Sequence, residues 1–276
     1  AHPFPSLLNA AATLALATIA GGAPPVAIRL AASMLALQTS IGALNDLADV
    51  GIDSGRKPGK PLPRGVVTVS EAGIVVVLGL VVGVGLSALS SPVTALVAAA
   101  GLACGYLYDL RLSRTRWSWV PLAVALPLVP VYAWVGVSGG VPADLIAIVP
   151  AGMLAGAALA LGNGVADEAR DRAAGIRTAP VVLGRARAVA LTALGLAGTV
   201  TIALALGPAL GGGEGRVPGS WRTVAMALSA GVMGVGLVLS TRPSAALRER
   251  GWELEALGVA ILAVAWLAGL SDLPAA

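Results

Sequence analysis

Two acidic motifs with the same spacing stand out in a chain that otherwise carries little charge. Each has an asparagine followed by two aspartates at intervals of four residues: Asn45, Asp49 and Asp53 in the first motif, and Asn163, Asp167 and Asp171 in the second. Residues four apart on an α-helix differ by about 40° and by about 6 Å along the axis. We therefore expect each motif to form a polar stripe along one helix face, with Asp46 on the flank of the first.

The residue types in these stripes indicate a site for hard cations. All the candidate ligands are oxygen atoms, because the single histidine, His2, and the single cysteine, Cys104, lie elsewhere. Mg²⁺ prefers such ligands, is usually shared with substrate phosphates, and can act in pairs on a leaving diphosphate. Aspartates at helix C-termini also need a compensating cation, because the helix dipole disfavours anions there. The predicted ligands of two Mg²⁺ ions are Asn45, Asp46, Asp49, Asp53, Asn163, Asp167 and Asp171.

Basic residues follow both stripes at short distance. Residues 55–65, GRKPGKPLPRG, interleave cations with three prolines, and proline restricts the backbone. An ordinary basic loop would not need this proline framework. A metal-binding stripe beside fixed cations is typical of a diphosphate site. The cations that we expect to bind diphosphate here are Arg56, Lys57, Lys60, Arg64, Arg172 and Arg177.

The segments that position these motifs are too apolar for a soluble domain. Hydrophobic residues make up 57% of the 276 residues and charged residues 12%, whereas a soluble domain carries about 25% charged residues. A membrane-spanning helix needs about 20 apolar residues, and Gly and Pro clusters end helices. These rules predict nine spans, at residues 5–21, 26–50, 70–89, 92–109, 118–137, 143–168, 186–207, 221–240 and 253–271.

The distribution of basic residues predicts the orientation of the chain in the membrane. If the N-terminus is inside, the inner loops are 51–69, 110–117, 169–185 and 241–252. With their immediate flanks, these loops contain all of the 18 Lys and Arg except Arg29, Arg216 and Arg222. This asymmetry follows the positive-inside rule, so the basic charge reflects topology and gives no indication of nucleic acid. Binding of anionic membrane lipids is an alternative explanation, but four separate loops that face one side fit topology first.

The predicted topology brings both stripes to the cytoplasmic face, because they close the second and sixth spans. A solvated cap, in which aspartates pair with loop arginines, is the alternative explanation. It would account for one stripe as well as a metal site does, but two matching stripes on one face favour the metal site. Asp109 and Asp144 lie outside both stripes, and we expect Arg248 and Arg250 only to orient the chain.

The paired motifs resemble those of the UbiA superfamily of intramembrane prenyltransferases. The first motif of that family, Asn-Asp-x2-Asp-x3-Asp, is matched at residues 45–53, and its proline-rich loop is matched at residues 57–65, with Lys for Arg. The second motif is followed by Gly-x-x-Thr-x-Pro-Val-x-Leu-Gly, which is matched at residues 175–184. With nine spans in the expected order, the resemblance covers nearly the whole chain.

The segment after the fourth predicted span departs from the family pattern. The family often has a tyrosine followed by a nearby lysine there, whereas this chain has Tyr106 and Tyr108, with Ser113 in place of the lysine and Arg114 beside it. The resemblance implies that Arg114 contacts diphosphate and that the tyrosines line a substrate pocket, although interfacial aromatics are an alternative for both. Tyr132 in the fifth span is a further pocket candidate, with core packing as the alternative.

The resemblance implies an all-α, polytopic membrane enzyme in which residues 1–276 form a single domain, with nine helices in one bundle around a central cavity open to the cytoplasmic side. The implied reaction is Mg²⁺-dependent transfer of a prenyl group from an isoprenyl diphosphate to an aromatic or lipid-like acceptor, by ionisation to an allylic carbocation. The residues to which it assigns the catalytic role are Asp49, Asp53, Asp167 and Asp171.

Three other functions are alternatives to prenyl transfer. A terpene cyclase of the same fold would use the same ionisation and remains the main alternative. The CDP-alcohol phosphotransferase motif is not matched, because Val50 follows Asp49 where that motif has glycine. A transporter would favour acidic residues near the midplane of the membrane, whereas these lie at helix ends. The acceptor, the prenyl chain length and the oligomeric state are left open.

Overall fold

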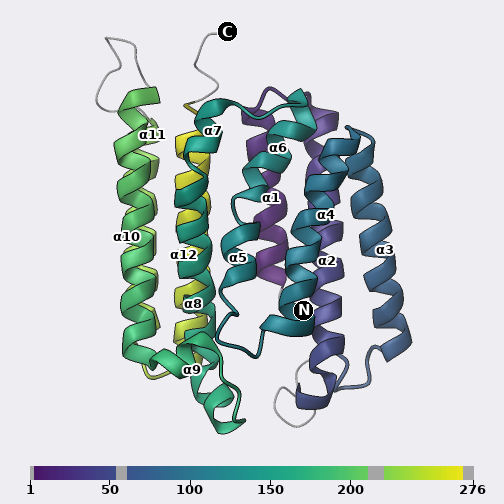
Figure 1. Cartoon of the computed structure of the whole chain (residues 1–276), viewed down its shortest axis with the longest axis vertical. Helices are drawn as coiled ribbons and strands as arrows, with labels where there is room; N and C mark the ends of the chain where they lie inside the picture. The colour runs from purple at the N-terminus through teal and green to yellow at the C-terminus, as the bar shows by residue number, and fades with distance from the viewer. Residues whose placement is uncertain (1–2, 54–60, 211–220, 270–276) are drawn as a thin grey trace. The chain divides into compact units, whose positions relative to one another are not determined.

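The structure is a computed structural model that describes residues 3–53, 61–210 and 221–269. These residues form helices throughout, joined by short turns (Figure 1). The elements are α1 (Pro3–Ile19), α2 (Pro24–Asp53), α3 (Val69–Ala88), α4 (Pro92–Leu107), the π-helical turn η1 (Tyr108–Leu112), α5 (Val120–Ala125), α6 (Leu128–Ser138), α7 (Ala143–Ala147), α8 (Val149–Ala173), α9 (Ala179–Leu183), α10 (Arg185–Leu210), α11 (Trp221–Ser240) and α12 (Ala245–Leu267).

The chain divides into two compact units. Unit 1 consists of Ala1–Leu112 and Val131–Gly140, and unit 2 of Ser113–Pro130 and Val141–Ala276. The fifth predicted span therefore passes from one unit to the other. It is interrupted between α5 and α6 at Pro127, which has no backbone N–H to donate to a helical hydrogen bond.

The expected all-α, multi-pass architecture is confirmed, and the number of spans is confirmed in part. Seven helical segments in the described part of the chain are long and apolar enough to cross a membrane: Pro24–Gly51, Val69–Ala88, Pro92–Leu112, Val120–Ser138, Val149–Ala173, Arg185–Leu206 and Trp221–Ser240. The other two predicted spans coincide with α1, which is apolar but has only 17 residues, and with α12, which begins with several charged residues.

Several helices extend beyond the boundaries predicted for the spans. The predicted inner loop 241–252 is helical over most of its length, because α12 begins at Ala245. Similarly, η1 continues to Leu112 and α8 continues to Ala173. Hydropathy locates the part of a helix that suits the lipid interior, whereas the backbone stays helical as long as its polar residues find partners.

In unit 1, helices α2 and α3 run antiparallel and pack closely. The Ser33 hydroxyl donates to the Gly83 carbonyl and the Ser40 hydroxyl to the Val76 carbonyl, each at 2.7 Å, so the contacts run in opposite directions along the two helices. A Cβ atom at Gly79 would lie 2.7 Å from the Ala36 carbonyl oxygen. Small residues thus allow the two backbones to approach, as is common between membrane helices.

Tyr132 on α6 joins this pair of helices. Its hydroxyl donates to Ser33 Oγ at 2.8 Å and lies 2.9 Å from Ser87 Oγ, and the side chain is only 2% exposed. This burial, with both hydroxyl contacts made inside unit 1, favours core packing for Tyr132. A place in the substrate pocket remains a prediction that these contacts do not support.

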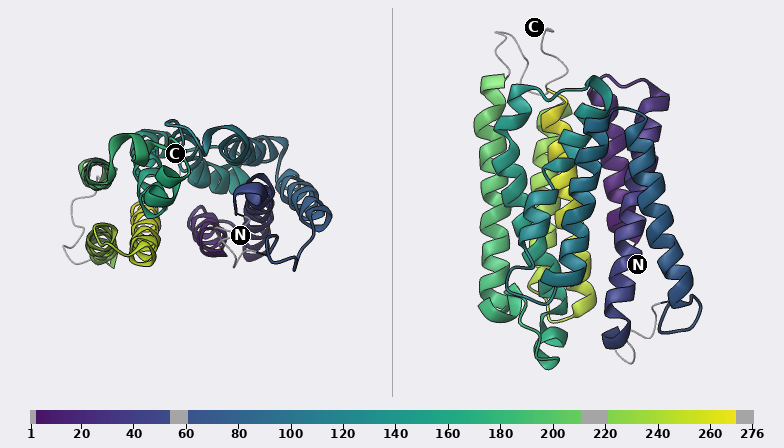
Figure 2. Two further views of the ribbon diagram at one scale, coloured as in Figure 1. Left: turned by 90° about the horizontal axis from the view of Figure 1, so that it is seen from below. Right: turned by 45° about the vertical axis from the view of Figure 1, so that its right-hand side comes forward.

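In unit 2, α8 packs against α5, α10 and α12. A Cβ atom at Gly156 of α8 would lie 2.4 Å from the Leu122 carbonyl oxygen of α5, so only glycine fits there. Helices α11 and α12 form a close pair, visible side by side in Figure 2, in which Gly236 and Gly251 face each other. Helix α8, which carries the second acidic motif, is thus held on three sides.

Candidate functional site

The first motif lies on the last turns of α2, a single helix that extends without interruption to Asp53. Asn45 and Asp49 are partly exposed, whereas Asp46 is only 9% exposed. The side chain of Asp53 lies outside the described part of the structure, and so do Arg56, Lys57 and Lys60. Their predicted roles remain predictions.

The end of α4 and the turn η1 pack along this part of α2. A Cβ atom at Gly105 would lie 2.5 Å from Ile41 Cδ1, and the Tyr106 hydroxyl lies 2.7 Å from Ser40 Oγ. Further along, Asn45 Nδ2 donates to Asp109 Oδ1 at 3.0 Å. From Tyr106–Ser40 to Asp109–Asn45 the contacts advance in the same direction along both segments, so α2 and α4 run parallel, as expected for two even-numbered spans.

Asp109 corrects the expectation that this residue is unrelated to the stripes. It is 5% exposed and accepts a hydrogen bond from the first residue of the first motif. The sequence offered only a general signal, because Asp109 ends a run without any charged residue that begins after Glu71. Burying an acidic residue among apolar helices costs free energy unless the carboxyl group has a hydrogen-bond or ion-pair partner.

The second motif lies on the C-terminal half of α8. Asn163 is exposed, and Asp167 and Asp171 are partly exposed. Asp167 forms an ion pair with Arg170, one turn further along the helix. The hydroxyl of Thr178 donates to Asp171 Oδ2 at 3.3 Å, so the segment after the helix returns to the last aspartate of the motif.

That returning segment, residues 174–184, explains the tail of the second motif in structural terms. Gly175 and Gly184 both have positive φ angles, of 71° and 81°, which residues with a side chain rarely adopt. Between them, α9 places Pro180 against Gly164, where a Cβ atom would lie 2.7 Å from the proline ring. The two glycines let the chain turn back, and Gly164 provides the space that the tail occupies.

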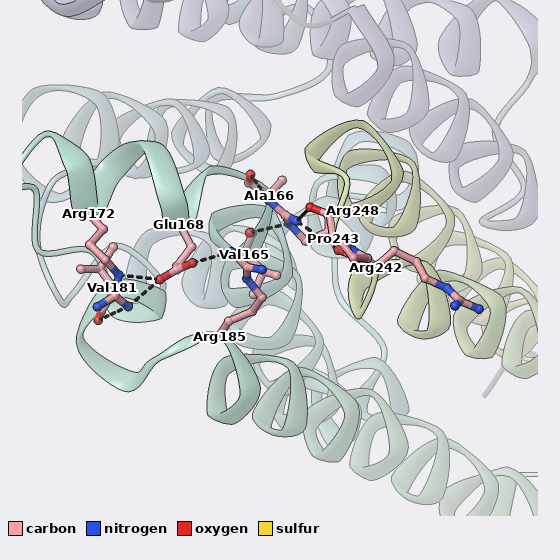
Figure 3. A network of polar contacts seen from close by, with 9 residues as sticks. All are labelled: Val165, Ala166, Glu168, Arg172, Val181, Arg185, Arg242, Pro243 and Arg248. Atoms are coloured by element: carbon pink, nitrogen blue, oxygen red, sulfur yellow. Dashed lines mark hydrogen bonds and ion pairs between the residues drawn. The ribbon is translucent and has the colours of Figure 1, made fainter.

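Glu168 is a buried acidic residue next to Asp167 of the second motif, and the sequence analysis did not identify it. It is 4% exposed and accepts hydrogen bonds from Arg172 Nε and Arg185 Nη2, both at 2.9 Å (Figure 3). Arg172 was predicted to bind diphosphate. Its side chain is largely exposed, but a diphosphate there would compete with Glu168 for the guanidinium group.

Arg248 corrects another expectation, namely that it serves only to orient the chain. The side chain is 3% exposed, and it donates through Nε to the Val165 carbonyl at 3.2 Å and through Nη2 to the Ala166 carbonyl at 3.4 Å (Figure 3). Its Nη1 donates to the carbonyls of Arg242 and Pro243. Arg248 therefore connects α12 to α8 directly before Asp167.

The remaining predicted site residues lie at the surface or near it. Arg64, Arg114 and Arg177 are exposed, and Tyr106 and Tyr108 are partly exposed. Nowhere in the described ranges do three His, Cys, Asp or Glu side chains group closely enough to hold a metal ion. The first stripe belongs to unit 1 and the second to unit 2, and each unit by itself offers part of the predicted ligand set.

Comparison with known proteins identifies the family. The UbiA prenyltransferase family matches residues 6–252. The chain is 35% identical over 209 residues to the digeranylgeranylglyceryl phosphate synthase of Halobacterium salinarum, and the match covers 72% of each protein.

Solved structures share the fold. The apo structure of a UbiA homologue from Aeropyrum pernix K1 has a TM-score of 0.76 at 22% identity, over 94% of this chain and 96% of that one. A UbiA homologue from Archaeoglobus fulgidus, solved with DMAPP and Mg²⁺, has a TM-score of 0.68 at 20% identity, over 98% of this chain and 99% of that one. The family match, the sequence relative and the common fold agree. The chain therefore belongs to the UbiA prenyltransferase family and is a multi-pass membrane prenyltransferase.

Proposed function

We propose that this enzyme transfers a prenyl group from an isoprenyl diphosphate to a hydrophobic acceptor, and that its two acidic stripes form one site at the cytoplasmic face of the cell membrane. The observation that carries the proposal is the repetition of Asn-x3-Asp-x3-Asp on α2 and α8, with members of each stripe left partly exposed by the surrounding protein. We also propose that residues 1–276 form a single functional domain.

The donor set fits Mg²⁺. Every predicted ligand offers oxygen, and Asn163 and Asp167 are accessible rather than packed in the core. The residues that would hold the ions, two in number, are Asn45, Asp46, Asp49, Asp53, Asn163, Asp167 and Asp171. Bound Mg²⁺ would stabilise the negative charge that develops on the diphosphate as its bond to the prenyl carbon breaks. The Archaeoglobus fulgidus homologue bound to DMAPP and Mg²⁺ supports this assignment.

The basic residues would bind the same diphosphate. Lys57 and Lys60 follow the first stripe on a proline-rich loop. Their positive charges would stabilise the leaving diphosphate more strongly than the intact substrate, because negative charge develops as the bond breaks. Arg172 would donate to the diphosphate either while its guanidinium group stays paired with Glu168 or after that ion pair breaks. The apolar helices would keep water away from the allylic cation. The remaining cations assigned to the diphosphate are Arg56, Arg64, Arg114 and Arg177.

The first acceptor to test is a prenylated glyceryl phosphate. The Halobacterium salinarum relative is a digeranylgeranylglyceryl phosphate synthase, and it is the 35% identity to that protein that favours this class over aromatic acceptors. A terpene cyclase, in which the cation closes on its own chain, is the alternative within the same fold.

A product assay tests the proposed reaction. Membranes containing the enzyme are incubated with Mg²⁺ and labelled prenyl diphosphates of several lengths, with and without geranylgeranylglyceryl phosphate. We expect a labelled lipid that appears only when both substrates are present, together with release of diphosphate. A labelled hydrocarbon formed equally well without any acceptor would contradict prenyl transfer and support cyclisation.

Labelling of introduced cysteines tests whether the stripes share a face. In a Cys104→Ser background, Ser54→Cys and Ala174→Cys are both expected to react with a membrane-impermeant thiol reagent only after the cytoplasmic side is exposed. Each position follows one acidic stripe, and both predicted loops are rich in basic residues. Ser220→Cys, in a predicted outer loop, provides the control of opposite orientation. Reaction of Ser54→Cys and Ala174→Cys from opposite sides would rule out a shared site.

A further inference from the structure

We infer that Asp109 is a positioning residue of the first acidic stripe, because it orients the Asn45 amide so that its oxygen faces the bound cation. This inference rests on the proposed function, since it names a supporting residue of the same site. It concerns a side chain outside both Asn-x3-Asp-x3-Asp motifs, on a different helix from the stripe that it supports.

The hydrogen bond between the two side chains has a direction. Asn45 Nδ2 donates to Asp109 Oδ1 at 3.0 Å. An ionised carboxylate can only accept hydrogen bonds, so it selects the NH₂ group of the amide and not its oxygen. Because Oδ1 and Nδ2 of Asn45 branch from the same carbon, fixing Nδ2 against Asp109 turns Oδ1 away from it. A cation binds only the oxygen, so this contact selects the amide orientation that binds metal.

The surroundings hold Asp109 in place. Asp109 is 5% exposed and lies in η1, a π-helical turn of the kind that often occurs at functional sites. One turn before it, Tyr106 bonds Ser40, whose own hydroxyl donates to the Val76 carbonyl of α3. The absent side chain of Gly105 lets Ile41 of α2 pack there. These contacts fix α4 against α2 directly before the point where Asp109 meets Asn45.

This arrangement prepares a ligand before the metal arrives. Residues that orient metal ligands typically contribute about 10- to 100-fold to metal affinity. An unsupported amide can present either its nitrogen or its oxygen, and the wrong orientation must be corrected on binding. The contribution of Asp109 should therefore appear in the affinity for Mg²⁺, and it should depend on the presence of Asn45.

Stabilisation by Mg²⁺ measures this contribution without relying on turnover. The purified protein in detergent is unfolded thermally at increasing Mg²⁺ with inorganic diphosphate at a constant concentration, and the Mg²⁺ concentration giving half of the stabilisation is recorded. Asp109→Ala should raise that concentration by about 10- to 100-fold. Asp109→Asn, which retains an oxygen that can accept from Asn45, should raise it less. Asp144→Ala, in α7, is the control and should leave it unchanged.

A double-substitution cycle separates positioning from a merely structural role. If Asp109 acts through Asn45, Asp109→Ala in an Asn45→Ala background should cause no further change in the Mg²⁺ midpoint. An equal shift in both backgrounds would overturn the inference. The inference would also be overturned if Asp109→Ala and Asp109→Asn both lowered the Tm measured without Mg²⁺ but left the Mg²⁺ midpoint unchanged. A wild-type protein that Mg²⁺ with diphosphate does not stabilise would instead reject the proposed metal site, and this inference with it.

Discussion

Replacing Asp49 or Asp167 by asparagine is expected to lower the rate of prenyl transfer by about a hundredfold or more, a loss of at least about 2.7 kcal/mol of transition-state stabilisation. Asparagine has nearly the same shape as aspartate but no charge, so the helix is preserved while the cation loses an anionic ligand. The same result is expected at Asp53 and Asp171. The measurement is turnover of a labelled prenyl diphosphate at saturating Mg²⁺, together with thermal unfolding of each variant.

Asp144→Asn is the control for this series. Asp144 is a partly exposed acid on the short helix α7, away from both motifs in the sequence, so its loss should leave turnover nearly unchanged. Asp109 is unsuitable as a control because it bonds Asn45. Comparable losses of turnover at Asp144 and at the four stripe aspartates would indicate general damage to the fold and would argue against a metal site.

Replacing Lys57 or Lys60 by alanine is expected to lower kcat/KM for the prenyl diphosphate by roughly 10- to 1,000-fold, as for the loss of one or two charge-assisted hydrogen bonds. A lysine that interacts with the developing charge of the leaving diphosphate lowers the barrier, so kcat should fall as well. The KM for the acceptor should change little, because the acceptor carries no part of that charge. Steady-state kinetics with each substrate varied in turn measures these constants.

Arg250→Ala is the appropriate comparison for the lysine variants. Its side chain is 72% exposed and pairs with Glu253 on the same helix, an arrangement that contributes little to stability. Arg248 cannot serve here, because its buried guanidinium group supports α8 and its loss would disturb the second stripe. If Lys57→Ala and Lys60→Ala retain the kinetics of Arg250→Ala, the loop only orients the chain and the proposed diphosphate contact is wrong.

The sequence by itself determined the features that depend on local periodicity. The spacing Asn45-x3-Asp49-x3-Asp53 makes a stripe on any α-helix, so the stripes could be recognised without knowing what packs beside them. The apolar segments likewise indicated membrane helices, because charged residues make up only 12% of the chain, against about 25% in a soluble domain. The predicted ends of these helices were less accurate. In α12, for example, the polar residues before the apolar run are helical as well.

Only the tertiary structure decided which polar residues support the stripes. Asp109 lies 64 residues from Asn45, Arg248 lies 83 residues from Val165, and Glu168 joins Arg172 of its own helix to Arg185 at the start of the next long one. Such contacts depend on which helix faces pack together and at what register, and glycines such as Gly105 and Gly164 set those distances. Charge and spacing along the chain do not encode this information directly. For that reason Asp109 and Arg248, which looked like bystanders in the sequence, prove to be bonded to the two helices that carry the acidic motifs.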